Sequence, residues 1–171
     1  EAIPGHHLQN ALNLENDDLS LYRRFGYYTS AFGEGWALYA ERLSLEIGLA
    51  DDLFDELGVL QSELFRAVRL VVDTGMHFKR WTREEAMDYM KRKTGMSDTE
   101  VTVEIERYIV WPGQACSYKV GMLKILELRE KAKQELGESF DIRDFHSAVL
   151  DHGEPPLFIV EELVNEMMNN R

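Results

Sequence analysis

Two histidines and a glutamate lie together at the start of the chain, in EAIPGHHLQ, where Glu1 precedes His6 and His7. A zinc hydrolase needs histidine and carboxylate ligands, an open position for water, and a second carboxylate that takes a proton from that water. The usual HExxH motif meets these needs on one helix. A histidine directly before Glu1 would give H-E-A-I-P-G-H-H, a lengthened form in which Pro4 and Gly5 must bulge the backbone for the second histidine to reach the metal.

A second acidic segment, GEGWALYAE, contains Glu34 and Glu41. Seven residues separate the two carboxylates, so two helical turns place both on one face, and both can point into the same cleft. One of them could bind a metal while the other supports it from behind. The alternative is an acidic helix face in contact with solvent, opposite an apolar stripe.

Asp73, His77 and Tyr118 also have side chains that suit hydrolytic chemistry. Asp73 and His77 lie four residues apart, where a carboxylate can hold an imidazole in one tautomer and raise its pKa. His77 could then donate a hydrogen bond to a substrate carbonyl, and the phenol of Tyr118 could stabilise the oxyanion of a tetrahedral intermediate. The structural alternatives are a helix-surface ion pair for Asp73 and His77, and a core position for Tyr118.

Other classes of hydrolase and metal site find no support in the sequence. There is no Glu-x-x-His pair of the kind that di-iron bundles use, and no G-x-S-x-G motif of serine hydrolases. The single cysteine, Cys116, lies in the apolar context QACSY, which favours a small buried thiol. Arg107, Lys119 and Arg129 are cations that could receive the carboxylate of a peptide terminus or pair with neighbouring glutamates.

Several motifs resemble the bacterial family called domain of unknown function 885 (DUF885), which is grouped with zinc peptidases of the HExxH type. They are EAIPGHHLQ, GEGWALYAE, VVDTGMHFKRWTREEA, RYIVWPGQACSYKVG and FHSAVLDHGEPPL, and they resemble the C-terminal half of that family. The resemblance implies Glu1 as the general base, His6 as the second zinc ligand and Glu34 as the carboxylate ligand. It also implies that the first ligand is a histidine immediately upstream of Glu1.

The resemblance therefore predicts part of a zinc-dependent metallopeptidase, cut within its own metal motif, that hydrolyses peptide bonds by metal-activated water. With only His6 and Glu34 of the ligand set, the chain itself is expected to be inactive and to bind zinc weakly or not at all. The sequence does not distinguish His6 from His7 as the ligand. The alternative function is a non-catalytic helical module that holds a peptide or acts as a scaffold. The resemblance alone suggests a periplasmic or cell-surface location.

Composition predicts one all-α domain over residues 1–171, and the resemblance implies that this domain is the C-terminal part of a longer protein. Four prolines and an abundance of Leu, Glu, Ala and Lys favour helix. The formal net charge of −12 disfavours nucleic acid, and no apolar run approaches the roughly 18 residues of a transmembrane segment. Loss of an N-terminal half would uncover apolar faces, so self-association is also expected.

Apolar periodicity, capping residues and helix breakers predict the helices that must position these side chains. Two capping boxes, TREE and SDTE, predict helices that begin near residues 82 and 97. The other predicted helices span residues 6–14, 30–47, 51–72, 114–136, 142–150 and 156–168. The two candidate ligands, His6 and Glu34, thus come from different helices.

Overall fold

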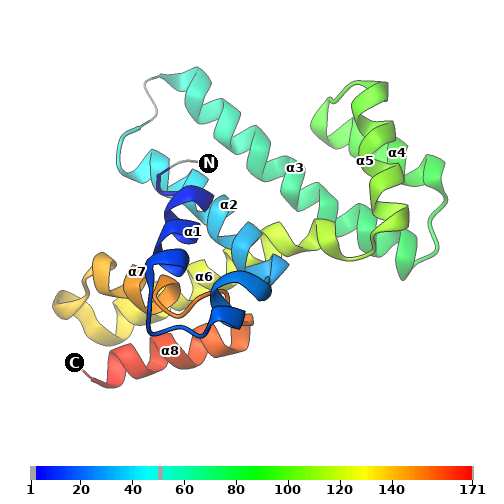
Figure 1. Ribbon diagram of the computed structural model, residues 1–171. Coiled ribbons are helices and arrows are strands. Elements are labelled where there is room, and N and C mark those ends of the chain that lie inside the picture. Colours follow the sequence, from blue (N-terminus) through cyan, green and yellow to red (C-terminus); the bar gives the residue numbers. More distant parts are fainter. Residues whose placement is uncertain (1–2, 50–51, 171) are drawn as a thin grey trace.

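The structure is a computed structural model that describes residues 3–49 and 52–170, and within these ranges every regular element is a helix (Figure 1). The elements are α1 (His6–Glu15), the π-helical turn η1 (Tyr22–Gly26), α2 (Ser30–Glu46), α3 (Leu53–His77), α4 (Arg83–Thr94), α5 (Asp98–Val110), α6 (Gln114–Leu136), the 3-10 turn η2 (Gly137–Ser139), α7 (Ile142–Leu150) and α8 (Leu157–Asn169). The all-α prediction is confirmed. None of the described helices is both long and apolar enough to cross a membrane.

Side-chain caps set the starts of several helices. The hydroxyl of Thr82 accepts from the backbone N–H of Glu85, whose carboxylate accepts in return from the N–H of Thr82. Ser97 and Glu100 form the same reciprocal pair before α5. Both predicted capping boxes are therefore present. Each satisfies amide donors that the start of a helix leaves without a partner.

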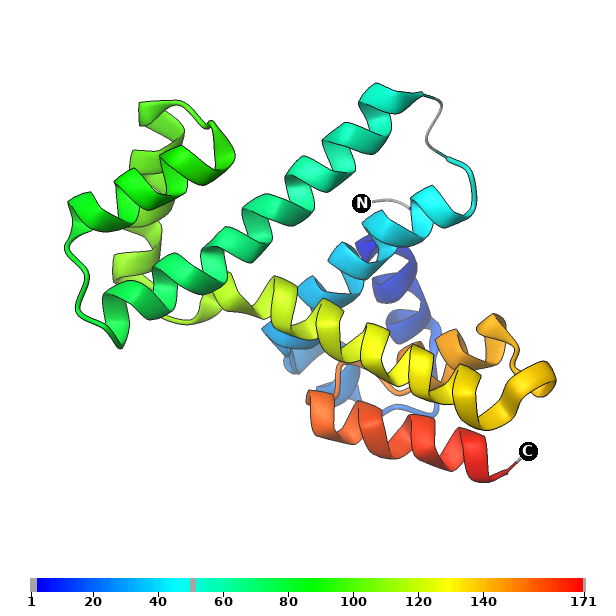
Figure 2. The same ribbon diagram turned by 180° about the vertical axis from the view of Figure 1, so that it is seen from behind.

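Buried apolar side chains form two clusters that α6 joins. The larger cluster lies among α2, α6, α7 and α8 and contains Phe32, Trp36, Tyr39, Met122, Ile125, Leu128, Phe145, Val149, Val160 and Val164. The smaller lies among α3, α4, α5 and the start of α6 and contains Val68, Val72, Ala86, Met90, Val101, Ile105, Tyr108 and Ala115. Figures 1 and 2 show α4 and α5 at one end of the molecule, away from α7 and α8.

Helices α2 and α6 cross in direct backbone contact at two glycines. A Cβ on Gly121 would lie 1.9 Å from the carbonyl oxygen of Ala31, and a Cβ on Gly35 would lie 2.5 Å from the Cα of Gly121. Since backbone surrounds both positions, only glycine allows this approach. The crossing fixes the part of α2 that carries Glu34.

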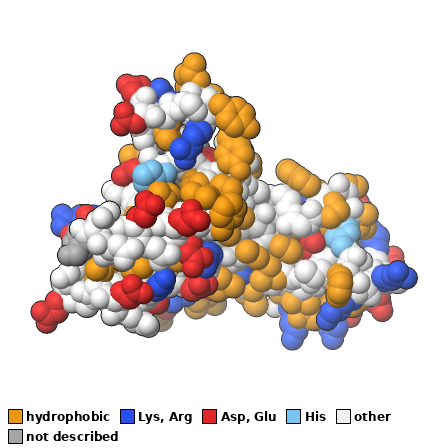
Figure 3. All heavy atoms as spheres, turned by 90° about the horizontal axis from the view of Figure 1, so that it is seen from below, with side chains coloured by type: hydrophobic (Ala, Val, Ile, Leu, Met, Phe, Trp, Pro, Cys, Tyr) orange, Lys and Arg blue, Asp and Glu red, His pale blue; other side chains and the backbone are white. Residues whose placement is uncertain are grey.

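The N-terminal half of α3 keeps the predicted apolar stripe but exposes it. Val68 and Val72 are buried, whereas the stripe residues nearer the start of α3 are exposed, with Leu53 at 80%. Figure 3 shows hydrophobic patches on the molecular surface. Apolar patches of this kind are typical of association surfaces, so self-association stays a prediction, which sedimentation showing only monomer would contradict.

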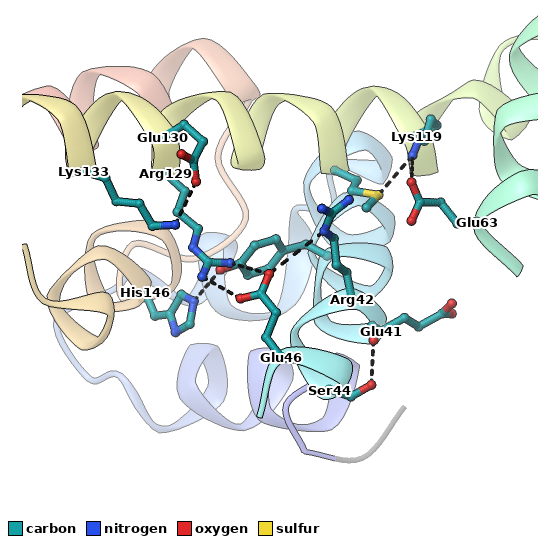
Figure 4. A network of polar contacts seen from close by, with 12 residues as sticks. Glu41, Arg42, Ser44, Glu46, Glu63, Lys119, Arg129, Glu130, Lys133 and His146 are labelled. Atoms are coloured by element: carbon teal, nitrogen blue, oxygen red, sulfur yellow. Dashed lines mark hydrogen bonds and ion pairs between the residues drawn. The ribbon is translucent and has the colours of Figure 1, made fainter. Parts of the chain in front are cut away.

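A polar network on α2, α6 and α7 lies beside the larger cluster (Figure 4). Arg129 donates to both carboxylate oxygens of Glu46, at 3.1 and 2.6 Å. The hydroxyl of Tyr39 lies 2.8 Å from Nε2 of His146. Burial, together with the nearby Arg129 cation, lowers the pKa of His146 from 6.5 to about 4. His146 is therefore neutral in the folded protein at pH 7.

This pKa shift predicts a loss of stability in mild acid. The unfolded chain binds a proton at His146 below about pH 6.5 and the folded protein only near pH 4, so the free energy of unfolding should fall as the pH is lowered through this window. The neutral state of His146 makes its full contribution to the free energy of unfolding above pH 6.5. This contribution, about 3 kcal/mol at most, is lost as the pH falls towards 4. Urea unfolding at successive pH values measures it, and His146→Gln should flatten the profile. Equal slopes for both proteins would contradict the prediction.

Candidate metal centre

The two predicted metal ligands meet at the wall of one cavity. His6 is the first residue of α1, Glu34 lies near the start of α2, and Nε2 of His6 is 3.5 Å from Oε2 of Glu34. A tetrahedral zinc ion with ligand bonds of about 2.1 Å holds its donor atoms roughly 3.4 Å apart. The observed separation therefore fits two ligands of one zinc ion.

Of the two histidines that the sequence left open as candidates, His6 lines the cavity while His7 is exposed. No third Asp, Glu, His or Cys among residues 3–49 and 52–170 joins the pair to form a possible metal site. Glu1, which the sequence suggests as the general base, lies outside the described residues. A catalytic zinc site needs three protein ligands, and this pair offers candidates for two of them.

Glu34 is held in place by hydrogen bonds to only one of its carboxylate oxygens. The hydroxyl of Tyr28 and Nε2 of Gln114 each donate to Oε1 at 3.4 Å. Burial and the charge of Glu34 raise the pKa of Tyr28 to about 12, so its hydroxyl stays protonated and can donate. These contacts leave Oε2 directed towards His6. Neither donor could be identified from the sequence, because neither shares a motif or a helix face with Glu34.

The cavity has a volume of about 280 Å³ and lies among α1, α2, α3 and α6. Tyr118 reaches it from α6 and also packs against the larger apolar cluster. Arg66 reaches it from α3 and was not among the predicted site residues. The Nε atom of Arg66 is buried and has no hydrogen-bond partner among the described residues. Its Nη1 atom donates to the hydroxyl of Ser62 at 2.5 Å.

Glu41 lines the same cavity, as its spacing from Glu34 predicted, but it contacts α3. Oγ of Ser62 donates to its Oε2 at 2.7 Å, and Nη2 of Arg66 lies 3.8 Å from its Oε1. The contacts of Glu41 thus join α2 to α3 and place Arg66 at the cavity. None of these contacts of Glu41 is with Glu34, so they do not support the prediction that Glu41 holds Glu34 in place as a metal ligand.

The expected pairing of Asp73 with His77 is not found. The buried carboxylate of Asp73 accepts from the backbone N–H of Gly113 at 3.0 Å, next to the start of α6. His77 donates from Nε2 to the carbonyl oxygen of Tyr108 at 2.9 Å. Eleven residues separate His77 from Arg66 along α3, roughly 16 Å at the rise of an α-helix. Neither Asp73 nor His77 lines the cavity, so both lie away from the candidate centre.

The three cations that the sequence suggested as anchors for a peptide carboxylate are each paired with a glutamate. Arg107 contacts Glu104, Lys119 contacts Glu63, and Arg129 contacts Glu46 (the last two in Figure 4). Pairing with neighbouring glutamates was the alternative interpretation. The Lys119 and Arg129 pairs join α6 to α3 and to α2, whereas the Arg107 pair lies within α5. Burial, with the nearby charge of Asp73, raises the pKa of the Cys116 thiol to about 11, as expected of an unreactive cysteine.

Comparison with known proteins gives a family and two solved relatives. One is a Colwellia psychrerythraea chain described as "the putative lipoprotein", with 54% sequence identity and a TM-score of 0.96. The match covers all of this chain and 29% of that chain. The other is a Shewanella oneidensis chain described as "a putative lipoprotein of unknown function", with 30% sequence identity and a TM-score of 0.86. The match covers 96% of this chain and 30% of that chain. The chain thus spans about three-tenths of these proteins. Among curated proteins, none matches it. The family described as "Bacterial protein of unknown function (DUF885)" matches residues 1–164, and the chain belongs to this family.

Proposed function

We propose that this chain carries part of the zinc site of a metallopeptidase. The observation that supports the proposal is the 3.5 Å separation of His6 Nε2 and Glu34 Oε2 at the wall of one cavity. In such a site zinc polarises a scissile carbonyl and lowers the pKa of a bound water. A histidine immediately before Glu1 would complete the ligand set.

The remaining residues of the cavity have roles in this proposal that follow from their positions. Tyr28 and Gln114 hold Oε1 of Glu34 and so direct Oε2 to the ligand position. The phenol of Tyr118 donates to the oxygen that becomes negatively charged when the carbonyl is attacked. Glu1 lies outside the described residues, and its role in the proposal comes from the family resemblance: it would take the proton and pass it to the leaving amine.

Arg66 suggests which part of a peptide faces α3. Among the described residues, no other Lys or Arg side chain lines the cavity. The guanidinium of Arg66 can donate to a substrate carboxylate or carbonyl. A carboxylate contact would make a substrate with a free C-terminus better than its amide. Comparing kcat/KM for the two substrates, in the parent enzyme and in Arg66→Gln, distinguishes this contact from a purely structural one.

We also propose a location in the cell envelope, because both solved relatives are described as lipoproteins. Fractionation of cells that produce the full-length protein tests this proposal. Recovery with cytosolic markers would contradict it.

The experiment that tests the function uses a chain extended upstream through the expected histidine. We expect one zinc per chain and hydrolysis of a peptide library, with the hydrolysis lost in Glu1→Gln while zinc is retained. The 171-residue chain is the matched comparison and should bind zinc weakly. No zinc and no hydrolysis by the extended chain would contradict the proposal and favour a peptide-binding or scaffold module.

A further inference from the structure

Two buried polar residues lie behind His6, on the side away from Glu34. Gln9, one turn along α1, is 3% exposed, and Glu154, in the segment before α8, is 7% exposed. Nε2 of Gln9 lies 3.1 Å from Oε1 of Glu154, and Oε1 of Gln9 lies 3.3 Å from Nδ1 of His6. The three side chains therefore form a continuous chain of hydrogen bonds from the segment before α8 to the cavity.

Glu154 is itself fixed by the segment that leads into α2. The backbone N–H of Thr29 lies 3.4 Å from its Oε2, and the hydroxyl of Thr29 donates to its backbone carbonyl at 2.8 Å. A carboxylate only accepts hydrogen bonds, so the amide group of Gln9 must turn its NH₂ towards Glu154. The carbonyl oxygen of Gln9 then faces His6 and can only accept.

The direction of this chain determines which nitrogen of His6 carries the proton. An acceptor at Nδ1 favours the tautomer with hydrogen on Nδ1, which leaves a lone pair on Nε2. Nε2 is the atom 3.5 Å from Glu34. The carboxylate of Glu34 favours the opposite tautomer, since it would accept from an Nε2–H. The two contacts therefore compete for the tautomer of His6.

We propose that Glu154, acting through Gln9, is a positioning residue that holds His6 as the Nδ1–H tautomer with its Nε2 lone pair directed into the cavity. A neutral imidazole binds a metal through such a lone pair, and a hydrogen bond at the other nitrogen fixes the ring. The value of this arrangement to a metal ligand rests on the proposed function, but the tautomer itself does not.

Nitrogen chemical shifts of His6 in the 171-residue chain at pH 8.5, without metal, test the proposal. We expect a protonated Nδ1 and an unprotonated Nε2. Gln9→Leu removes the acceptor, and Glu154→Gln removes the group that orients the amide of Gln9. Each should shift the tautomer ratio towards Nε2–H by about threefold to tenfold, the effect of one hydrogen bond.

The exchange of the two side chains, Gln9→Glu with Glu154→Gln, is the decisive variant. It keeps charge and volume, places a carboxylate acceptor at Nδ1, and lets the amide at position 154 donate to it, so the Nδ1–H tautomer should return. A predominant Nε2–H tautomer in the parent chain, or a swap that behaves like Glu154→Gln alone, would overturn the proposal.

Zinc binding by the extended chain separates this proposal from the proposed function. If the tautomer responds as expected, Glu154→Gln should also weaken zinc binding by about 10- to 100-fold, as other changes behind metal ligands do. If the variants change the tautomer but the extended chain binds no zinc, the positioning role of Glu154 is supported and the proposed peptidase function is contradicted. Zinc binding with unchanged tautomers in the variants would remove the positioning role alone.

Discussion

Replacing Glu34, the proposed zinc ligand, with glutamine is expected to weaken zinc binding by the upstream-extended chain more than a hundredfold and to abolish the proposed peptidase activity. Loss of a residue behind a ligand already costs about 10- to 100-fold in metal affinity, and loss of the ligand itself should exceed that range. The surroundings of Glu34 increase the effect. Tyr28 and Gln114 both donate to Oε1, so an amide at position 34 would keep its oxygen towards them and turn its NH₂ towards His6.

Glu41→Gln is the matched control for this prediction. It makes the same substitution on the same helix and at the same cavity, but the contacts of Glu41 are with Ser62 and Arg66. Its zinc affinity, measured by competition with a chelator of known affinity, should stay close to that of the parent. Equal losses in both variants would indicate a general disturbance of α2, and retained zinc in Glu34→Gln would exclude Glu34 as a ligand.

The fold could be predicted where local chemistry determines it. Capping boxes at Thr82 and Ser97 need only residues within one turn, and both start helices as expected. The end of α3 is different, because the helix continues to His77 through Gly75, where a Cβ would lie 2.5 Å from the Trp81 ring. The contact between Gly75 and Trp81 forms because the chain folds back on α3 after the helix ends. The apolar repeat of α3 gives no indication of this contact. The single π-helical turn η1 likewise leaves no periodic signal.

The candidate site shows the same limit. The meeting of His6 with Glu34 follows the family resemblance, and spacing correctly placed Glu41 at the same cavity. Spacing failed for Asp73 and His77, because four residues on a helix allow a contact but do not provide it. The actual partners of Asp73 and His77 are backbone groups of α5 and of the α5–α6 connection.

The residues around His6 and Glu34 could not be predicted for a related reason. Gln9 and Glu154 are 145 positions apart, and Gln114 is 80 positions from Glu34. Polar partners so distant in sequence are brought together only by the packing of α1, α2 and α6. A sequence that suggests candidate ligands therefore does not show which residues hold them in place.

The same packing predicts the largest effect on stability, at the crossing of α2 and α6. Gly121→Ala would place a methyl group 1.9 Å from the carbonyl oxygen of Ala31, and a backbone atom cannot move aside as a side chain can. Overpacked sites cost typically 1–3 kcal/mol, so we expect a loss of about 3 kcal/mol or more in the free energy of unfolding, measured in urea. The thermal midpoint should fall by roughly 10 °C.

Gly58→Ala separates this contact from the intrinsic effect of the substitution. Gly58 also lies within a helix, but a Cβ there meets no atom within 4 Å. Alanine at an open helix position should raise the free energy of unfolding by about 0.5–1 kcal/mol, because it restricts the unfolded chain. The two variants should therefore change stability in opposite directions. If Gly121→Ala were also stabilising, α2 and α6 could not be in backbone contact, and the position of Glu34 opposite His6 would lose its structural basis.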